Sequence, residues 1–365
     1  RLAGVTATTP EPAGGQIVRE RSGEASGVFV DNAEDLISGK IPPPTREETR
    51  EALIAGMRKC LRAGLTQVHD AGVSSEGLEL YREILVKGGF PFRIYAMLGG
   101  DTTLLDAAFA RGPEIGLGDG RLTIRSVKLY VDGALGSRGA ALLSPYRDDA
   151  ANTGLVRTKP SQLETIAARA ASAGFQIAAH AIGDRGNRIA LDTFEKSLAN
   201  AKQADHRFRV EHAQVLAPEE IPRFAKLKVI ASMQPTHATS DMYWAEERVG
   251  AERIRGAYAW RALLDSGARI ACGSDFPVES ENPLLGFYAA VTRQDLKGWP
   301  EGGWQPGQRL TREEALRCFT TEPAWAAFEE KSRGMIRAGF LADLTVLSRD
   351  IMTAPVICAR PEQTV

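Results

Sequence analysis

The sequence has little that would tie it to nucleic acid, to a membrane or to a disulfide-stabilised fold. Its 365 residues carry 45 Lys and Arg against 46 Asp and Glu, a net charge of −1. No excess of one sign therefore favours nucleic acid or an anionic membrane. No apolar run reaches the roughly 20 residues that a membrane-spanning helix needs. We expect neither nucleic acid nor membrane as a partner.

Cysteine is scarce as well. The four residues, Cys60, Cys272, Cys318 and Cys358, are widely scattered and form no Cys-x-x-Cys pair. This spacing favours structural thiols in a reducing compartment over a disulfide framework. We therefore expect a cytoplasmic location.

An alternation of helices and strands follows a Gly-, Pro- and Thr-rich opening. A capping box, Thr45 to Glu48, begins a helix whose apolar residues Leu53, Met57 and Leu61 share one face. A second capping box, Ser161 to Glu164, predicts another helix start. Candidate strands lie at 66–72, 92–98, 124–133, 175–184, 208–214, 229–237 and 269–278. Seven strands separated mostly by helices predict an α/β fold, a (β/α)8 TIM-type barrel with one strand missing from the count.

The changes in sequence pattern along the chain divide it into three predicted parts. We expect residues 1–44 to form an irregular loop and hairpin segment inserted in the barrel. Residues 45–330 would form the barrel, as strands 2 to 8. Residues 331–365, where "ADLTVLS" alternates without a following helix, would begin a small β-sandwich.

Titratable side chains gather where the predicted strands end. Four of the five histidines fall there, and only His206 lies in a connecting loop. The strand-end residues are His69, Asp70, Lys128, His180, Asp184, Glu211, His212, His237 and Asp275. Because active sites of such barrels lie at the carboxyl ends of the strands, these side chains are candidates for chemistry.

Each of these residues also has a structural interpretation when taken alone. A single strand-end histidine is more often a hydrogen-bonded structural residue than a ligand. Lys128 could extend to solvent or pair with a carboxylate, and the "GSD" at Asp275 could be a turn. His69 keeps the structural interpretation, with Asp70 orienting its ring.

The set as a whole points to a metal site. His180, His212 and Asp275 end neighbouring strands, so their side chains can converge above the barrel. Zinc accepts neutral imidazole and carboxylate ligands and leaves a position for water at catalytic sites. An aspartate beside such a water can act as general base. The residues therefore predict a metal hydrolase.

Longer motifs carry a resemblance to a known family. "VKLYVDGALGSRGA", "HAIGDRGN", "RVEHAQ" and "GSDFPVES" occur in this order, followed by "LTREEALRCFTTEPAWA". The chain resembles the amidohydrolase superfamily, and within it the subgroup of N-substituted formamide deformylases, from Arg1 to about Asp350. The resemblance implies a metal-dependent barrel with a β-sandwich built from both termini.

The resemblance also implies roles for individual residues. Lys128 would be carboxylated and bridge two divalent metals, usually zinc, because carboxylation turns a costly buried cation into an anion. His180 and His212 would hold the second metal. Asp275 would bind the first metal and act as catalytic base. Asp132, Arg138 and Asp184 would contact substrate, and His237, from the residues alone, would donate to the substrate or oxyanion.

The sequence departs from the family pattern at one point. The family places an His-x-His motif at the end of the first barrel strand, and no such motif occurs here. Because the sequence also begins without Met, we expect a fragment that starts downstream of that strand. Two metals per chain would then require the motif in the full protein.

Together these features predict a metal-dependent hydrolase that cleaves a non-peptide C–N bond, an amide or N-formyl group, of a small molecule. One alternative keeps the barrel but changes the bond to a lactone, ester, phosphoester or decarboxylation substrate. Another is a non-catalytic binding relative without the first metal site. A homodimer is our expectation for assembly.

Overall fold

A curled sheet of seven parallel strands forms the body of the protein. The computed structural model describes residues 3–199, 205–355 and 359–365. The sheet order is β10-β9-β8-β7-β6-β4-β3, so neighbours in sequence are neighbours in space. Its strands are β3 (Gln67–Val73), β4 (Arg93–Leu98), β6 (Leu122–Tyr130), β7 (Gln176–Ala181), β8 (Arg209–His212), β9 (Ile230–Met233) and β10 (Arg269–Cys272). All seven predicted strands are confirmed, and the sheet is open between β3 and β10, as expected for a TIM-type barrel that lacks one strand.

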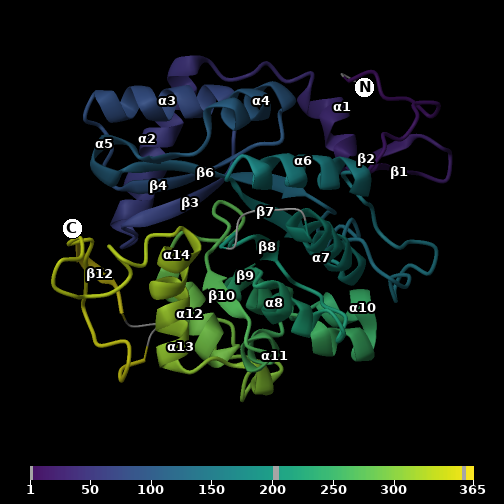
Figure 1. Cartoon of the computed structure of the whole chain (residues 1–365). Coiled ribbons are helices and arrows are strands. Elements are labelled where there is room, and N and C mark those ends of the chain that lie inside the picture. The colour runs from purple at the N-terminus through teal and green to yellow at the C-terminus, as the bar shows by residue number, and fades with distance from the viewer. Residues whose placement is uncertain (1–2, 200–204, 356–358) are drawn as a thin grey trace.

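Helices cover the outer face of this sheet (Figure 1). The longer helices of the chain are α2 (Arg46–Arg62), α3 (Ser75–Val86), α4 (Thr102–Arg111), α6 (Pro160–Ser172), α7 (Asp184–Ala199) and α12 (Pro283–Thr292). Shorter ones are α1 (Asp35–Ser38), α5 (Leu117–Gly120), α8 (Ile221–Leu227), α9 (Pro235–Asp241), α10 (Ala245–Arg253), α11 (Trp260–Asp265), α13 (Arg312–Phe319) and α14 (Thr321–Ala326). The most buried strands, such as β4 and β9, are accordingly apolar, whereas β6 and β8 also carry the charged residues Lys128, Arg209 and Glu211.

One of the two predicted capping boxes forms. Thr45 caps α2, where its side chain accepts from the Glu48 amide while the Glu48 carboxylate accepts from the Thr45 amide. The Ser161–Glu164 prediction is wrong, because α6 already begins at Pro160, with Lys159 as its N-cap. Proline suits the first position of a helix, so Ser161 lies inside the first turn and caps nothing.

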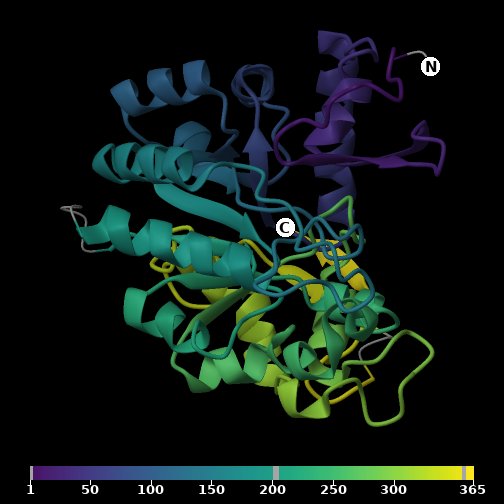
Figure 2. The same ribbon diagram turned by 90° about the vertical axis from the view of Figure 1, so that its right-hand side faces the viewer.

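Two small antiparallel pairs flank the sheet. Near the N-terminus, β1 (Gly15–Arg19) pairs with β2 (Ala25–Asp31) as the predicted hairpin, which projects from the body in Figure 2. Near the C-terminus, β11 (Thr345–Leu347) pairs with β12 (Pro361–Thr364). A short strand that the sequence did not predict, β5 (Glu114–Gly116), pairs antiparallel with β6. The three proposed domain boundaries stay predictions.

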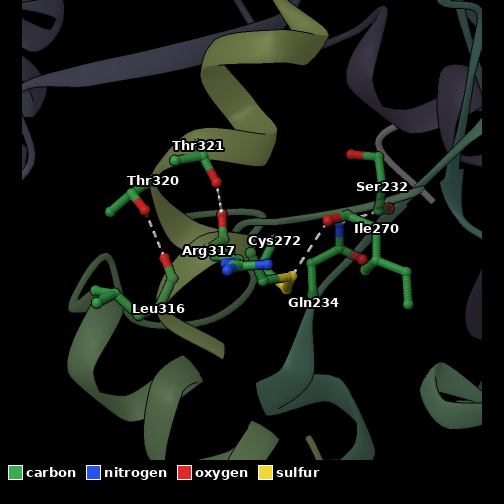
Figure 3. The surroundings of a disulfide bond; sticks show 9 residues. Ser232, Gln234, Ile270, Cys272, Leu316, Arg317, Thr320 and Thr321 are labelled. Atoms are coloured by element: carbon green, nitrogen blue, oxygen red, sulfur yellow. Dashed lines mark hydrogen bonds between the residues drawn. A yellow bond between two sulfur atoms is a disulfide. The ribbon is translucent and has the colours of Figure 1, made fainter. Parts of the chain in front are cut away.

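The cysteines depart from expectation. Cys272, the last residue of β10, forms a disulfide with Cys318 of α13 (Figure 3). The expectation of free structural thiols is therefore wrong for this pair, whereas Cys60 is a free, buried thiol. Cys358 lies outside the described residues.

Candidate active site

Lys128, Tyr130 and His180 meet at the carboxyl rim of the sheet. Lys128 and Tyr130 stand two residues apart on β6 and so share one face of the strand. In the parallel register of β6 and β7, Tyr130 lies opposite His180 and Lys128 opposite Ala178. Lys128 is therefore one layer deeper in the barrel than the other two.

Lys128 is a buried amine without an ion-pair partner. Its residue is 4% exposed, and its Nζ lies 4.4 Å from the centre of the Tyr130 ring. Burial lowers the pKa of Lys128 to about 8, and the negative charges of Glu211 and Asp275 only partly oppose this effect. No hydrogen bond or ion pair joins Nζ to another part of the chain that the structure describes. A large share of this amine is thus neutral near pH 8.

His180 and His212 form a pair of neutral imidazoles. Their ring centres are 4.5 Å apart, at 71° to each other. Burial, followed by the charge of Lys128, holds the pKa of His180 well below its usual range. Burial likewise holds the pKa of His212 well below its usual range, and the neighbouring His180 and Lys128 lower it further. Uncharged imidazole is the form that binds a metal.

A hydrogen bond orients His212, the last residue of β8. Its Nδ1 lies 2.7 Å from Oε1 of the Gln234 side chain, so Nδ1 carries the proton and donates a hydrogen bond to that oxygen. The other ring nitrogen, Nε2, then keeps its lone pair free. His180 has a longer contact, 3.4 Å from Nε2 to the Gly133 carbonyl oxygen. Such outer hydrogen bonds select the tautomer of a metal-binding histidine.

His237 lies beside this pair but not on a strand. β9 ends at Met233, and Pro235 begins α9, which carries His237 in its first turn. The prediction that His237 ends a strand is therefore wrong: His237 lies in the helix that follows β9, because proline both stops the strand and starts the helix. The His237 ring is 5.9 Å from that of His212, and its buried Nε2 has no hydrogen-bond partner among the described residues. Burial lowers its pKa to about 4.

Asp275 follows β10 at the same rim, where solvent reaches it. It has a positive φ of 58°, which directs the chain away from the strand. Desolvation by the surrounding protein raises the pKa of its carboxyl to about 6, while the charge of Lys128 lowers this pKa and the charges of Glu211 and Glu279 raise it. A carboxyl with this pKa exchanges protons readily near neutral pH.

The three predicted substrate residues occupy other surroundings. Asp132 is fully buried and accepts from the amides of Ala141, Ile182 and Gly183, at 2.8–2.9 Å. Burial raises its pKa to about 7 despite these bonds. These bonds join the loops that follow β6 and β7, and contact of Asp132 with substrate stays a prediction.

Asp184 and Arg138 are likewise engaged within the chain. Asp184 accepts from the Leu143 and Arg185 amides, at 2.8 and 2.9 Å. Arg138 binds the Asp148 carboxylate through two nitrogens, at 3.2 and 2.8 Å. Both side chains fix the loop that follows β6, and their contact with substrate stays a prediction.

Sequence reasoning missed a buried arginine inside the barrel. Arg209 of β8 contacts His69 Nδ1 at 2.7 Å, Ser232 Oγ at 2.7 Å and both carboxylate oxygens of Glu211. The His69 ring thus contacts Arg209 in place of the expected Asp70, because the Asp70 carboxylate accepts a hydrogen bond from the Tyr81 hydroxyl. Arg209 and Glu211 stand two residues apart and so share one face of β8. This spacing is the sequence feature that could have revealed the buried arginine.

The described residues fit part of a metal centre. The neutral pair of His180 and His212, with one free nitrogen fixed by Gln234, suits a divalent metal. In residues 3–199, 205–355 and 359–365, however, no three His, Cys, Asp or Glu side chains are grouped so that they could hold a metal ion. The remaining donors of a complete centre are not assembled by these residues.

Comparison with known proteins places these features in context. The sequence profile of the amidohydrolase family matches residues 1–362. YtcJ of Bacillus subtilis is 34% identical over 96% of this chain and 66% of its own length. An N-substituted formamide deformylase of Arthrobacter pascens is 30% identical over 99% of this chain and 66% of its own. The chain thus spans slightly less than two thirds of these relatives.

Solved structures agree with the fold. An uncharacterised metal-dependent hydrolase from Pyrococcus horikoshii superimposes with a TM-score of 0.80 at 28% identity, over 93% of this chain and 68% of that one. Among the described residues, no helix combines the length and the apolar character needed to cross a membrane.

Proposed function

Because this chain belongs to the amidohydrolase family, a family with metal-dependent hydrolases among its structural relatives, we propose that it cleaves a non-peptide C–N bond of a small molecule. The bond would be an amide or an N-formyl group. The observation that carries the proposal is the neutral, oriented pair of His180 and His212 beside the buried Lys128. The deformylase relative supports the choice of bond.

His180 and His212 would hold a divalent metal, zinc by our proposal, and Lys128 would be a further ligand once it is carboxylated. A metal bound there would polarise the substrate carbonyl and lower the pKa of water. A second metal would require donors beyond those that the described residues bring together.

Two further residues would move or direct protons. Asp275, whose pKa is about 6, accepts the proton of the attacking water and returns it to the departing amine nitrogen. His237 stays neutral at physiological pH and, with its proton on Nε2, donates a hydrogen bond to the carbonyl oxygen. The carboxylate of Asp275 therefore transfers the proton, and the neutral imidazole of His237 supplies a hydrogen bond.

The test compares bonds and variants in one assay. The metal-supplemented protein is incubated with the N-formyl and N-acetyl derivatives of a small primary amine and with matched formate and acetate esters. We expect cleavage of the amides, and a loss of about 10²–10⁴-fold in Asp275→Asn, the range for a general base. Asp106→Asn, which alters a surface ion pair with Arg169, is the matched control.

Two outcomes would contradict the proposal. Cleavage of esters alone would favour the alternative bond, with the barrel chemistry retained. Absence of any hydrolysis would favour the non-catalytic binding relative.

A further inference from the structure

Arg157 is a charged residue at the rim that the proposed mechanism does not use. It lies in the loop between β6 and α6, where its backbone amide donates to the Val131 carbonyl at 2.8 Å. The neighbouring Val156 bridges to Asp132. The backbone of Arg157 is thus fixed directly beside the end of β6.

The N-terminal hairpin orients its side chain. Arg157 Nε donates to Asn32 Oδ1 at 2.8 Å, and Asn32 Nδ2 donates to the carbonyl oxygens of Ala13 and Arg157. The hairpin also packs closely here, since a Cβ on Gly14 would lie 2.8 Å from Arg157 Cα. One edge of the guanidinium is therefore occupied, and its direction is set.

The other edge of the guanidinium is free. Neither Nη1 nor Nη2 of Arg157 has a hydrogen bond or ion pair to any residue that the structure describes. Asp31 is the nearby carboxylate, and the structure contains no ion pair between the two. A fork of two unpaired N–H groups matches the geometry of a carboxylate, which arginine binds through two parallel hydrogen bonds.

The guanidinium group of Arg157 lies next to the candidate active site. The Arg157 guanidinium carbon is 5.1 Å from the centre of the Tyr130 ring, and the His180 ring is 5.7 Å from the same centre. Tyr130 is 36% exposed, and its hydroxyl has no hydrogen-bond partner in the described chain. Arg157 and His180 thus flank one solvent-accessible aromatic ring that carries an unused donor.

We propose that Arg157 and Tyr130 form a carboxylate subsite, so that the substrate is an N-acyl or N-formyl compound bearing a carboxylate close to the scissile bond. Arg157 binds the carboxylate through its two Nη groups, and the Tyr130 hydroxyl donates a further hydrogen bond. The neutral amide then lies toward His180. This inference deepens the proposed function and rests on it for the position of the amide.

Equilibrium binding tests the subsite without turnover. Calorimetry compares N-acetylglycine with its uncharged counterpart N-acetylglycine amide on the purified chain. We expect the carboxylate to bind about tenfold more tightly or better, as charge-assisted hydrogen bonds predict. Arg157→Gln should abolish this preference, and Arg157→Lys should restore part of it. Arg169→Gln, which removes a surface arginine paired with Asp106, should keep it.

A second variant changes the preference in the opposite direction. Asp31→Asn removes the nearby negative charge at nearly constant shape, and it should strengthen carboxylate binding. If the thermal melt of Arg157→Gln shows that this variant fails to fold, the effect of Asp31→Asn on carboxylate binding tests the subsite instead. Equal binding of the two probes, no binding of either, or a preference that survives in Arg157→Gln overturns the proposal. Arg157-dependent binding without hydrolysis would retain the subsite and refute the proposed reaction.

Discussion

The side chain of Lys128 shows how burial prepares a residue for chemistry. A lysine in water holds its proton to a pKa near 10.4. Here desolvation lowers that pKa to about 8, and Nζ lies over the ring of Tyr130. Only the neutral amine can react with carbon dioxide, so the surroundings of Lys128 favour the carboxylation that we propose for it.

Carboxylation of Lys128 should follow this titration. At a fixed concentration of dissolved ¹³C-labelled carbon dioxide, we expect a carbamate signal in the ¹³C NMR spectrum. The signal should grow from about pH 7 to about pH 9, as the amine loses its proton. Lys128→Met should lack the signal, whereas Lys87→Met, which alters an exposed ion pair, should retain it. A signal of equal size in Lys128→Met would show that the carbamate forms elsewhere.

Single residues were predictable where the strand pattern determined their position. Lys128, His180 and His212 do lie together at one rim, because parallel strands end at a common edge. The resemblance to the family implies a substrate contact for Asp132, and that contact stays a prediction. Sequence cannot tell whether a carboxylate faces solvent or the backbone amides of a neighbouring loop, and in the structure Asp132 accepts from three such amides.

At the scale of elements, a sequence pattern predicted a helix start correctly when all the residues that form the cap lie within the pattern itself. The capping box at Thr45 is complete within four residues. The Ser161 pattern is equally local, but α6 begins at Pro160 with Lys159 as its N-cap, two residues before the predicted cap. The disulfide is different, since Cys272 and Cys318 are 46 residues apart and only the packing of α13 against β10 brings them together.

The two candidate caps make a matched pair for a stability measurement. Thr45→Ala removes a working N-cap and should lower the free energy of unfolding by about 1 kcal/mol. Ser161→Ala alters an exposed residue inside a helix and should change it by less than about 0.5 kcal/mol. Urea unfolding followed by circular dichroism measures both. Equal losses in the two variants would show that the cap at Thr45 contributes nothing specific.

For the whole molecule, the alternation of helices and strands was enough to predict the sheet. Seven parallel strands in sequential order form as expected, and the family profile covers residues 1–362. The complete set of metal donors could not be placed in the same way. The sequence holds five histidines and no His-x-His motif, and the described residues do not group three donors.

The central claim is that His180 and His212 make this chain a metal-dependent hydrolase. The most direct measurement is the rate of N-formyl amine hydrolysis by chelator-treated protein as zinc is added back. We predict no hydrolysis without metal, recovery with zinc, and no recovery in the His180→Asn/His212→Asn double variant. Equal hydrolysis before and after zinc addition, or full recovery in the double variant, would contradict the account.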